Sequence, residues 1–147
     1  MQRSASDSQL RRAAPTRIVV SGWRDYTDYA EFSKVMHLVV GGRAVELIAG
    51  DASGADAMTQ RYAREHALPF TMFPADWRRY GKGAGPIRNC AMVAVAQELV
   101  AFQKEGTPGT QNAIDEARKA ALKITVVPID VDGEPHRKRA RVLKRHL

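Results

Sequence analysis

The sequence predicts an α/β fold in which helices cover both faces of an open parallel sheet of five strands. Two observations predict it. Five apolar segments alternate with four segments of helical periodicity, the pattern of linked strand–helix–strand units. The third and fifth apolar segments each contain a proline, Pro69 and Pro128, and proline is tolerated better at a sheet edge than in its centre. The strand order 3-2-1-4-5 places both of these strands at an edge, so we expect a Rossmann-like, doubly wound sheet.

The first strand and the first helix have the clearest signals. Residues 17–22 (RIVVSG) form an apolar run that predicts a buried strand. Residues 28–42 predict a helix, because Asp28 and Glu31 have the spacing of a capping box and Gly41 is a typical stop. Its predicted buried face consists of Phe32, Val35, Met36 and Val39.

The next three elements follow without a long connection. Residues 44–50 (AVELIAG) predict the second strand, and residues 53–67 predict the second helix with Ser53 as its N-cap. Residues 68–73 (LPFTMF) predict a third, shorter strand.

The second half begins with a long predicted loop at 74–85 (PADWRRYGKGAG). A helix is expected to start at Pro86, since proline is favoured at the first helical position. Residues 98–103 predict the fourth strand, and residues 124–129 predict the fifth. The helix between these strands is predicted to have Thr107 as its N-cap and an apolar face of Ala113, Ile114, Ala117, Ala120 and Ala121.

Length and charge divide the chain into three parts. The 147 residues suit one domain, which we place at 17–130 between a disordered leader at 1–16 and a basic tail at 131–147. The net charge is +7, and the tail alone has six Lys or Arg residues against two acids. The basic character therefore belongs mostly to the ends of the chain and does not indicate a nucleic-acid-binding body.

Composition argues against several classes of protein. The single cysteine, Cys90, excludes an internal disulfide and a cysteine-based zinc site, and its apolar surroundings predict a buried thiol. His37 and His66 are expected at the surface, and no cluster has metal-ligand spacing, so we expect no metal and no cofactor. The sequence has no signal-peptide pattern and no apolar run long enough to span a membrane, so we expect a cytoplasmic protein.

The unusual residues follow the predicted strands. Ligands bind an open α/β sheet in the crevice at the carboxyl ends of its strands, where the strand order reverses between the first and fourth strands. The segments that reach this edge are 21–25, 50–56, 74–90 and 106–110. The predicted ligand-binding residues are Ser21, Gly22, Trp23, Arg24, Gly50, Asp51, Gly54, Asp56, Asp76, Trp77, Lys82, Gly85, Arg88, Asn89, Gly109 and Thr110.

These residue types suit a phosphorylated ligand. Glycines allow the backbone to approach a phosphate, and the first turn of a helix offers free amide groups and a favourable dipole. Arg24, Lys82 and Arg88 add positive charge, and Trp23 or Trp77 could stack on a base. Each feature also has a structural explanation: the helix starts can be simple caps, the glycines simple loop residues, and Trp77 an anchor of its loop.

Five segments together resemble the YspA / cpYpsA-related branch of the SLOG superfamily. They are SGWRDYTD, GDASGADAMTQRYA, FPADWRRYGKGAGPIRNCAMV, LVAFQKEGTPGTQNAIDEARKA and ITVVPI, and they cover residues 17–129 in order. The resemblance implies a Rossmann-like domain that binds a nucleotide or a nucleotide-derived ligand as a sensor or processing domain. It also implies a homodimer, which is common among SLOG relatives.

The related "lonely guy" phosphoribohydrolases suggest an enzymatic alternative, cleavage of the N-glycosidic bond of a nucleotide. Arg88 resembles their helix-start arginine, and Gly109-Thr110 resembles the end of their P-G-G-x-G-T loop. Their glutamate has no counterpart, because Gln111 and Asn112 follow Thr110. The catalytic candidates are Arg88, Asp51 and Asp76, and Asp25 or Asp56 could also supply a carboxylate. A third possibility is that the basic tail binds single-stranded nucleic acid.

Overall fold

The computed structural model describes residues 14–130 and 144–146 and contains a six-stranded sheet in the order β3-β2-β1-β4-β5-β6. The strands are β1 (Thr16–Gly22), β2 (Val45–Ala49), β3 (Phe70–Met72), β4 (Glu98–Gln103), β5 (Lys123–Pro128) and β6 (Lys144–His146). The helices are α2 (Tyr29–Val40), α3 (Ala55–Glu65), α4 (Trp77–Tyr80), the 3-10 turn η1 (Gly81–Gly83), α5 (Ala84–Ala94) and α6 (Pro108–Lys119). The first five strands are parallel, so the predicted order 3-2-1-4-5 is confirmed.

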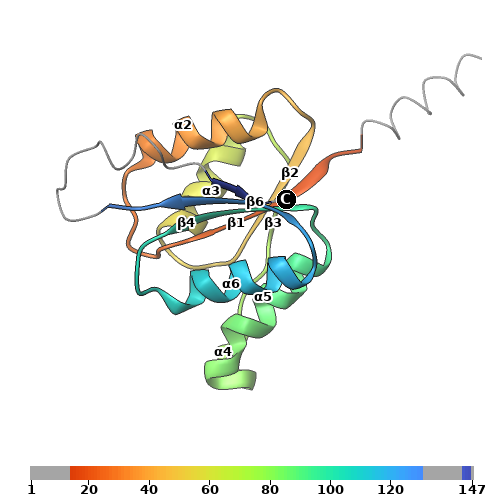
Figure 1. Cartoon of the computed structure of the whole chain (residues 1–147). Coiled ribbons are helices and arrows are strands. Elements are labelled where there is room, and N and C mark those ends of the chain that lie inside the picture. The colour runs from red at the N-terminus through yellow and green to blue at the C-terminus, as the bar shows by residue number, and fades with distance from the viewer. Residues whose placement is uncertain (1–13, 131–143, 147) are drawn as a thin grey trace, which may run out of the picture.

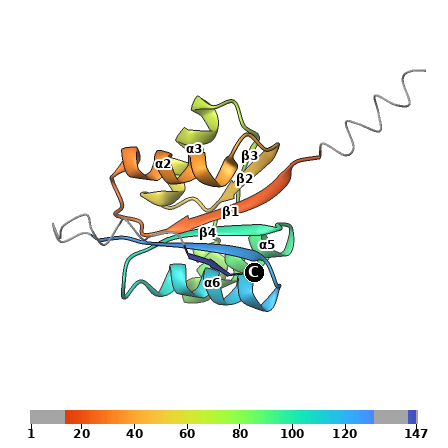
Figure 2. The same cartoon turned by 45° about the horizontal axis from the view of Figure 1, so that its top comes forward.

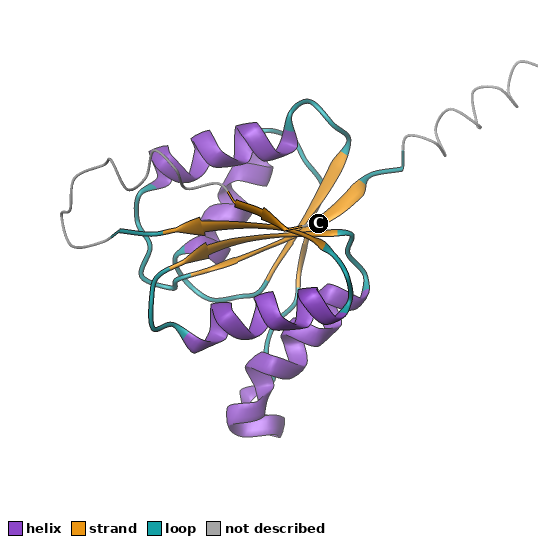
Figure 3. Cartoon of the chain, viewed as in Figure 1, coloured by secondary structure: helices purple, strands orange, loops and turns teal. Residues whose placement is uncertain are grey.

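The sheet forms the middle of three layers (Figures 1 and 3). Helices α2 and α3 cover one face, and α5 and α6 cover the other, which Figure 2 shows from a second direction. Successive residues of β1 face opposite layers, because side chains alternate along a strand. Ile18 and Val20 pack with Phe32 of α2, whereas Val19 packs with Ile114 of α6. This double burial explains why the central strands are continuous apolar runs.

Helix α2 begins and ends as predicted. The Asp28 carboxylate accepts a hydrogen bond from the Glu31 amide (3.0 Å), and Gly41 closes the helix in the left-handed conformation at φ 53°. The four residues of its predicted inner face are buried.

The N-cap of α3 differs from the prediction, whereas α6 has the predicted N-cap residue without the expected side-chain hydrogen bond. Gly54, not Ser53, caps α3, because the Ser53 hydroxyl donates to the Arg24 carbonyl (2.8 Å) in the neighbouring loop. Thr107 does cap α6, but its hydroxyl donates to the Lys104 carbonyl instead of accepting from the helix. Ala120 and Ala121 are exposed, because α6 ends at Lys119 and the chain turns there.

The predicted loop at 74–85 is largely helical. Asp76 caps α4 by accepting from the Arg79 amide (3.1 Å), and η1 connects α4 directly to α5. Helix α5 therefore begins at Ala84, and Pro86 is its third residue. The capping of α4 by Asp76 is the local interaction that the sequence interpretation missed.

Strand β6 was not predicted. It pairs antiparallel with β5 between Ile124 and Val126, so β5 is not an edge strand over these residues. Pro128 is compatible with this arrangement because it lies beyond the residues of β5 that pair with β6. The rest of the predicted basic tail (131–143 and 147) and most of the predicted leader (1–13) lie outside the described residues.

Three further expectations concern single residues. Cys90 is exposed, so the predicted burial was wrong: the inner side of α5 presents Asn89, Met92 and Val93 to the core, and Cys90 faces away. His37 and His66 are exposed, as expected.

Within the described residues, no helix is long and apolar enough to cross a membrane, and no group of His, Cys, Asp and Glu could hold a metal ion.

Candidate ligand-binding site

Arg88 lies at the centre of the carboxyl edge of the sheet, defined here as the loops that follow β1 to β4. It stands in the second turn of α5, two residues further inside the helix than predicted, so the helix dipole acts on it only weakly. Nη1 donates to Oδ1 of Asp51 and to the carbonyl of Phe73, each over 3.3 Å. The side chain is 14% exposed. Asp51 is therefore the acidic partner of Arg88.

Gly50 makes room for this arginine. A Cβ atom at residue 50 would overlap Nη1 of Arg88 and would stand 2.8 Å from Oδ2 of Asp56. Only glycine therefore permits β2 to end directly beneath the guanidinium. The close approach brings Gly50, Asp51, Asp56 and Arg88 together.

Asp56 is the buried carboxylate of this group. It lies in the first turn of α3, is 8% exposed, and accepts a hydrogen bond at Oδ2 from the Ala52 amide (3.1 Å). Burial raises the pKa of Asp56 to about 6, although the Ala52 amide and the charge of Arg88 oppose the rise. The Asp56 carboxyl group can therefore exchange a proton near neutral pH. Asp51 lies beside it and is exposed to solvent.

Asn89 connects α5 with the start of α6. Its Nδ2 donates to the Gly109 carbonyl (3.3 Å) and to Oδ1 of Asn112 (2.9 Å), and its Oδ1 accepts from Nε of Arg88 (3.2 Å). Asn89 and Thr110 are both buried. These contacts orient Arg88 through Asn89 and place Gly109 beside Asn89.

The end of β1 forms a second group at the same edge. Ser21 and Gly22 pair with β4, and a Cβ at Gly22 would stand 2.7 Å from the Phe102 carbonyl. Gly54 has φ 71°, and its Cα lies against the backbone of Trp23 and Arg24. The Arg24 side chain is exposed. Glycines here allow backbone segments to pack closely, which explains them without a ligand.

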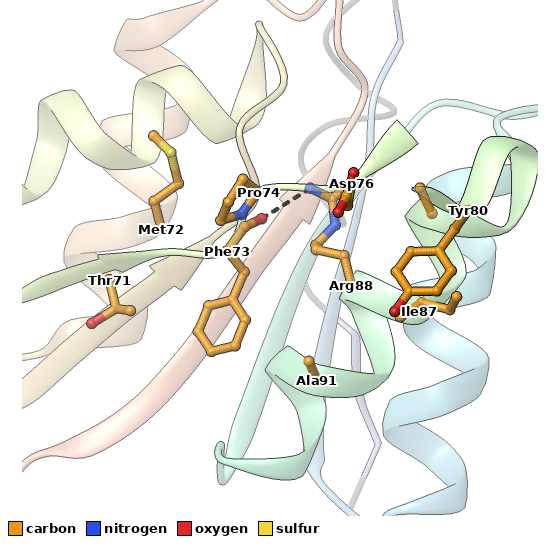
Figure 4. Close-up of a pocket in the computed structure, with 10 residues that line it drawn as sticks. Thr71, Met72, Phe73, Pro74, Asp76, Tyr80, Ile87, Arg88 and Ala91 are labelled. Atoms are coloured by element: carbon orange, nitrogen blue, oxygen red, sulfur yellow. Dashed lines mark hydrogen bonds between the residues drawn. The ribbon is translucent and has the colours of Figure 1, made fainter. Parts of the chain in front are cut away.

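A cavity of about 290 Å³ opens beside Arg88, between the segment after β3 and helix α5 (Figure 4). Figure 4 shows the arginine reaching from α5 toward the carbonyl of Phe73. The lining is mostly apolar and consists of Thr71, Met72, Phe73, Pro74, Asp76, Tyr80, Ala84, Ile87, Arg88 and Ala91. A guanidinium at the mouth of an apolar cavity suits a ligand with one anionic and one apolar end.

Three of the predicted site residues, Trp77, Lys82 and Asp76, do not belong to the group formed by Gly50, Asp51, Asp56 and Arg88. Trp77 is 56% exposed and packs against Gly85, whose Cβ position is 3.5 Å from the indole. Lys82 is exposed on η1. Asp76 lines the cavity but also caps α4.

The sequence interpretation placed the crevice between the first and fourth strands and missed most of the residues of this cavity. Phe73 directly follows β3, Tyr80 lies in α4 and Ile87 lies in α5. The sequence had assigned these residues to a strand, a loop and a helix, respectively. Asn112, the partner of Asn89, was also missed. No local pattern identifies these residues, because they meet only when α4 and α5 fold beside β3.

Comparisons with known proteins define the class. The chain resembles the fold of DNA processing protein A (DprA) from Streptococcus pneumoniae, with a TM-score of 0.65 and 14% identity over 82% of this chain and 53% of that one. DNA processing protein A from Helicobacter pylori gives a TM-score of 0.58 and 16% identity over 80% of this chain and 67% of that one. The chain thus spans about half of the S. pneumoniae protein. These likenesses and the site together define a Rossmann-like domain with a polar carboxyl edge.

Sequence comparison gives the family. The sequence model of the YspA, cpYpsA-related SLOG family matches residues 16–80. The Gene 61 protein of Mycobacterium phage D29 is 32% identical over 118 residues, which cover 74% of this chain and 93% of that protein. The chain belongs to the YspA, cpYpsA-related SLOG family.

Proposed function

We propose that the chain binds a nucleotide or a nucleotide-derived phosphorylated ligand at the carboxyl edge, with Arg88 on the phosphate. The observation that supports this most directly is the position of Arg88. Its guanidinium lies above the side-chain-free Gly50 and beside an apolar cavity of about 290 Å³.

The phosphate end has several donors. Nη2 of Arg88 makes no hydrogen bond to any residue within 14–130 or 144–146, so it is available to a ligand. The first turn of α6 adds amides without partners inside its helix, whereas the Ala55 amide at the start of α3 already donates to the Trp23 carbonyl. Arg24 and Lys82 supply further exposed positive charge at the same edge.

The apolar end suits a base. The cavity volume is at the lower limit of typical small-molecule sites, about 300–1,000 Å³, so the ligand should be small. Phe73, Tyr80 and Ile87 offer apolar contact to a flat ring. The structural neighbours are DNA processing proteins, and the H. pylori protein binds single-stranded DNA, which agrees with a ligand of nucleotide chemistry.

Isothermal titration calorimetry with mono-, di- and cyclic nucleotides tests the proposal. We expect at least one nucleotide to bind the wild type and Arg88→Ala to weaken it about 100-fold, because a charge-assisted fork is lost. Arg88→Lys should restore little, since an ammonium cannot replace the fork. Arg64→Ala on α3 is the control, because it removes the same charge from an exposed position.

Two results would contradict the proposal. One is the absence of binding by any nucleotide of the panel. The other is equal binding by wild type and Arg88→Ala.

Asp56 favours a second candidate function, hydrolysis of the N-glycosidic bond of a nucleotide. A carboxyl group with a pKa of about 6 can act as an acid or a base, and Arg88 would hold the phosphate beside it. Incubation with nucleoside monophosphates should then release free base. The function is supported if the wild type releases base and Asp56→Asn does not, while Asp56→Asn still binds the nucleotide. It is rejected if the wild type releases no base.

The other functional expectations stay predictions. The cytoplasmic location rests on the sequence, and the homodimer rests on the resemblance to SLOG relatives. The residues of the basic tail that would contact nucleic acid lie mostly outside the described part of the chain.

A further inference from the structure

Helix α4 and turn η1 form an exposed aromatic and cationic surface, of which the proposed nucleotide site uses only Tyr80 and Lys82. This surface, the α4 surface, consists of Trp77, Arg78, Arg79, Tyr80 and Lys82. All five residues are exposed. Figure 1 shows α4 projecting from the body of the domain beyond α5, on the side away from α2.

The charge of this surface is unbalanced. Between Trp77 and Arg88 the chain has four Lys or Arg residues and no Asp or Glu. Within residues 14–130 and 144–146, Arg78, Arg79 and Lys82 form no ion pair. Three cations within five residues repel one another unless an anionic partner is present. The charge therefore favours a partner with closely spaced negative groups.

The aromatic residues narrow the choice of partner. Trp77 is 56% exposed and Tyr80 41% exposed, although large apolar side chains usually lie inside. The indole packs against the backbone at Gly85, so it is held in place while most of its surface stays open. Arg79 lies over the Tyr80 ring, with 5.2 Å between Cζ and the ring centroid. Rings with flanking cations match unpaired bases joined by phosphates, which stack on aromatic side chains.

We propose that the α4 surface binds single-stranded nucleic acid, with a base stacked on Trp77 and phosphates on Arg78, Arg79 and Lys82. A duplex keeps its bases inside and offers no ring to Trp77. The stacking contact is separate from the nucleotide site, because Trp77, Arg78 and Arg79 do not line the cavity beside Arg88. It also places nucleic-acid binding on the folded domain, whereas the sequence had suggested the basic tail.

Fluorescence anisotropy with labelled oligo-dT and oligo-U tests this on the full chain. We expect Trp77→Ala to weaken binding about tenfold and Trp77→Phe to recover most of the loss, since phenylalanine still stacks. Leu38→Ala on α2 is the control for removing an exposed apolar side chain. Binding of either sugar type satisfies the proposal, and the comparison identifies which one is preferred.

Salt dependence tests the cationic part. Three phosphate contacts to a single strand predict a slope of log K against log salt of about −2, and Arg78→Gln or Lys82→Gln should each reduce it by about 0.7. In a Trp23→Phe background, quenching of the remaining tryptophan reports stacking on Trp77 directly.

Four outcomes would overturn the proposal. They are no binding by the wild type, equal binding by Trp77→Ala, duplex DNA or polyphosphate binding as tightly as the single strand, and loss of all binding when Lys138, Arg139 and Arg141 are replaced by glutamine. Nucleotide binding measured by calorimetry should be unchanged in Trp77→Ala. A failure of the α4 surface is therefore distinguishable from a failure of the nucleotide site.

Discussion

The guanidinium of Arg88 occupies the space that a side chain at Gly50 would fill. This relationship joins the end of β2 to α5 and holds Arg88 at the mouth of the cavity. Even an alanine at residue 50 would therefore displace side chains of the site, Arg88 and Asp56, and would leave the hydrophobic core in place.

Gly50→Ala should therefore weaken nucleotide binding as much as Arg88→Ala does, while the domain stays folded. The overlapping atoms belong to the flexible ends of Arg88 and Asp56, so we expect a stability loss of only about 1 kcal/mol and a loss of affinity equal to that of Arg88→Ala. Calorimetry and urea unfolding measure the two effects. Gly83→Ala, whose Cβ would meet only Ile87 at 3.9 Å, is the matched control, and normal binding by Gly50→Ala would contradict the role given to Arg88.

Asp56 should make the domain less stable as the pH rises from about 4 to 6. Burial raises its pKa from 3.8 to about 6, so in this interval the folded chain holds a proton that the unfolded chain has released. Stability from this group is full below about pH 4, falls through the interval, and is constant above it. Asp56→Asn should remove this dependence, which amounts to about 3 kcal/mol.

Urea unfolding of both proteins at about pH 4.5 and 7.5 measures the effect. The same pH dependence in the wild type and in Asp56→Asn would assign it to other groups. Arg88→Ala should extend the dependence to higher pH, because the charge of Arg88 lowers the pKa of Asp56.

Gly54→Ala should be strongly destabilising, in contrast to the substitution at residue 50. Gly54 has φ 71°, and a Cβ there would stand 2.5 Å from the Trp23 carbonyl, which belongs to the backbone and cannot move aside. We expect a loss of about 3 kcal/mol in thermal or urea unfolding. Gly109→Ala, in a helix and with no neighbouring atom within 4 Å, should be neutral or slightly stabilising.

Asn89→Asp should separate α5 from the start of α6. The new oxygen would face the Gly109 carbonyl and Oδ1 of Asn112, two acceptors that now receive hydrogen bonds. We expect a stability loss of about 2–3 kcal/mol at neutral pH. The cost should be smaller in an Asn112→Ala background, and full additivity of the two changes in unfolding experiments would show that they do not interact.

Local signals in the sequence predicted local structure well. The alternation of apolar segments and the two prolines led to the correct order of the five parallel strands, although Pro69 lies just before β3 and β6 pairs with β5. Asp28 capped α2 as predicted, because its partner Glu31 is three residues away. Ser53 and Thr107 did not cap through their side chains, since the folded chain offered each hydroxyl a carbonyl acceptor in a neighbouring turn.

The candidate site was predictable in part. Strand ends and glycines identified the carboxyl edge, and Arg88, Gly50, Asp51 and Asp56 were among the residues expected there. The cavity was not predictable, because Phe73, Tyr80 and Ile87 become neighbours only when α4 and α5 pack beside β3. The strand β6 was missed for the same reason: its pairing with β5 joins residues about twenty positions apart.

The amino-acid sequence by itself determined the order of the strands, the residues that reach the carboxyl edge and the positions where glycine is required. Those features depend on side-chain size, backbone freedom and periodicity, which act over a few residues. Only the tertiary structure decided that Arg88 pairs with Asp51, that Asp56 is buried enough to raise its pKa, and that Trp77 stays exposed. Charge pairing and desolvation depend on distances between segments, and folding alone sets those distances.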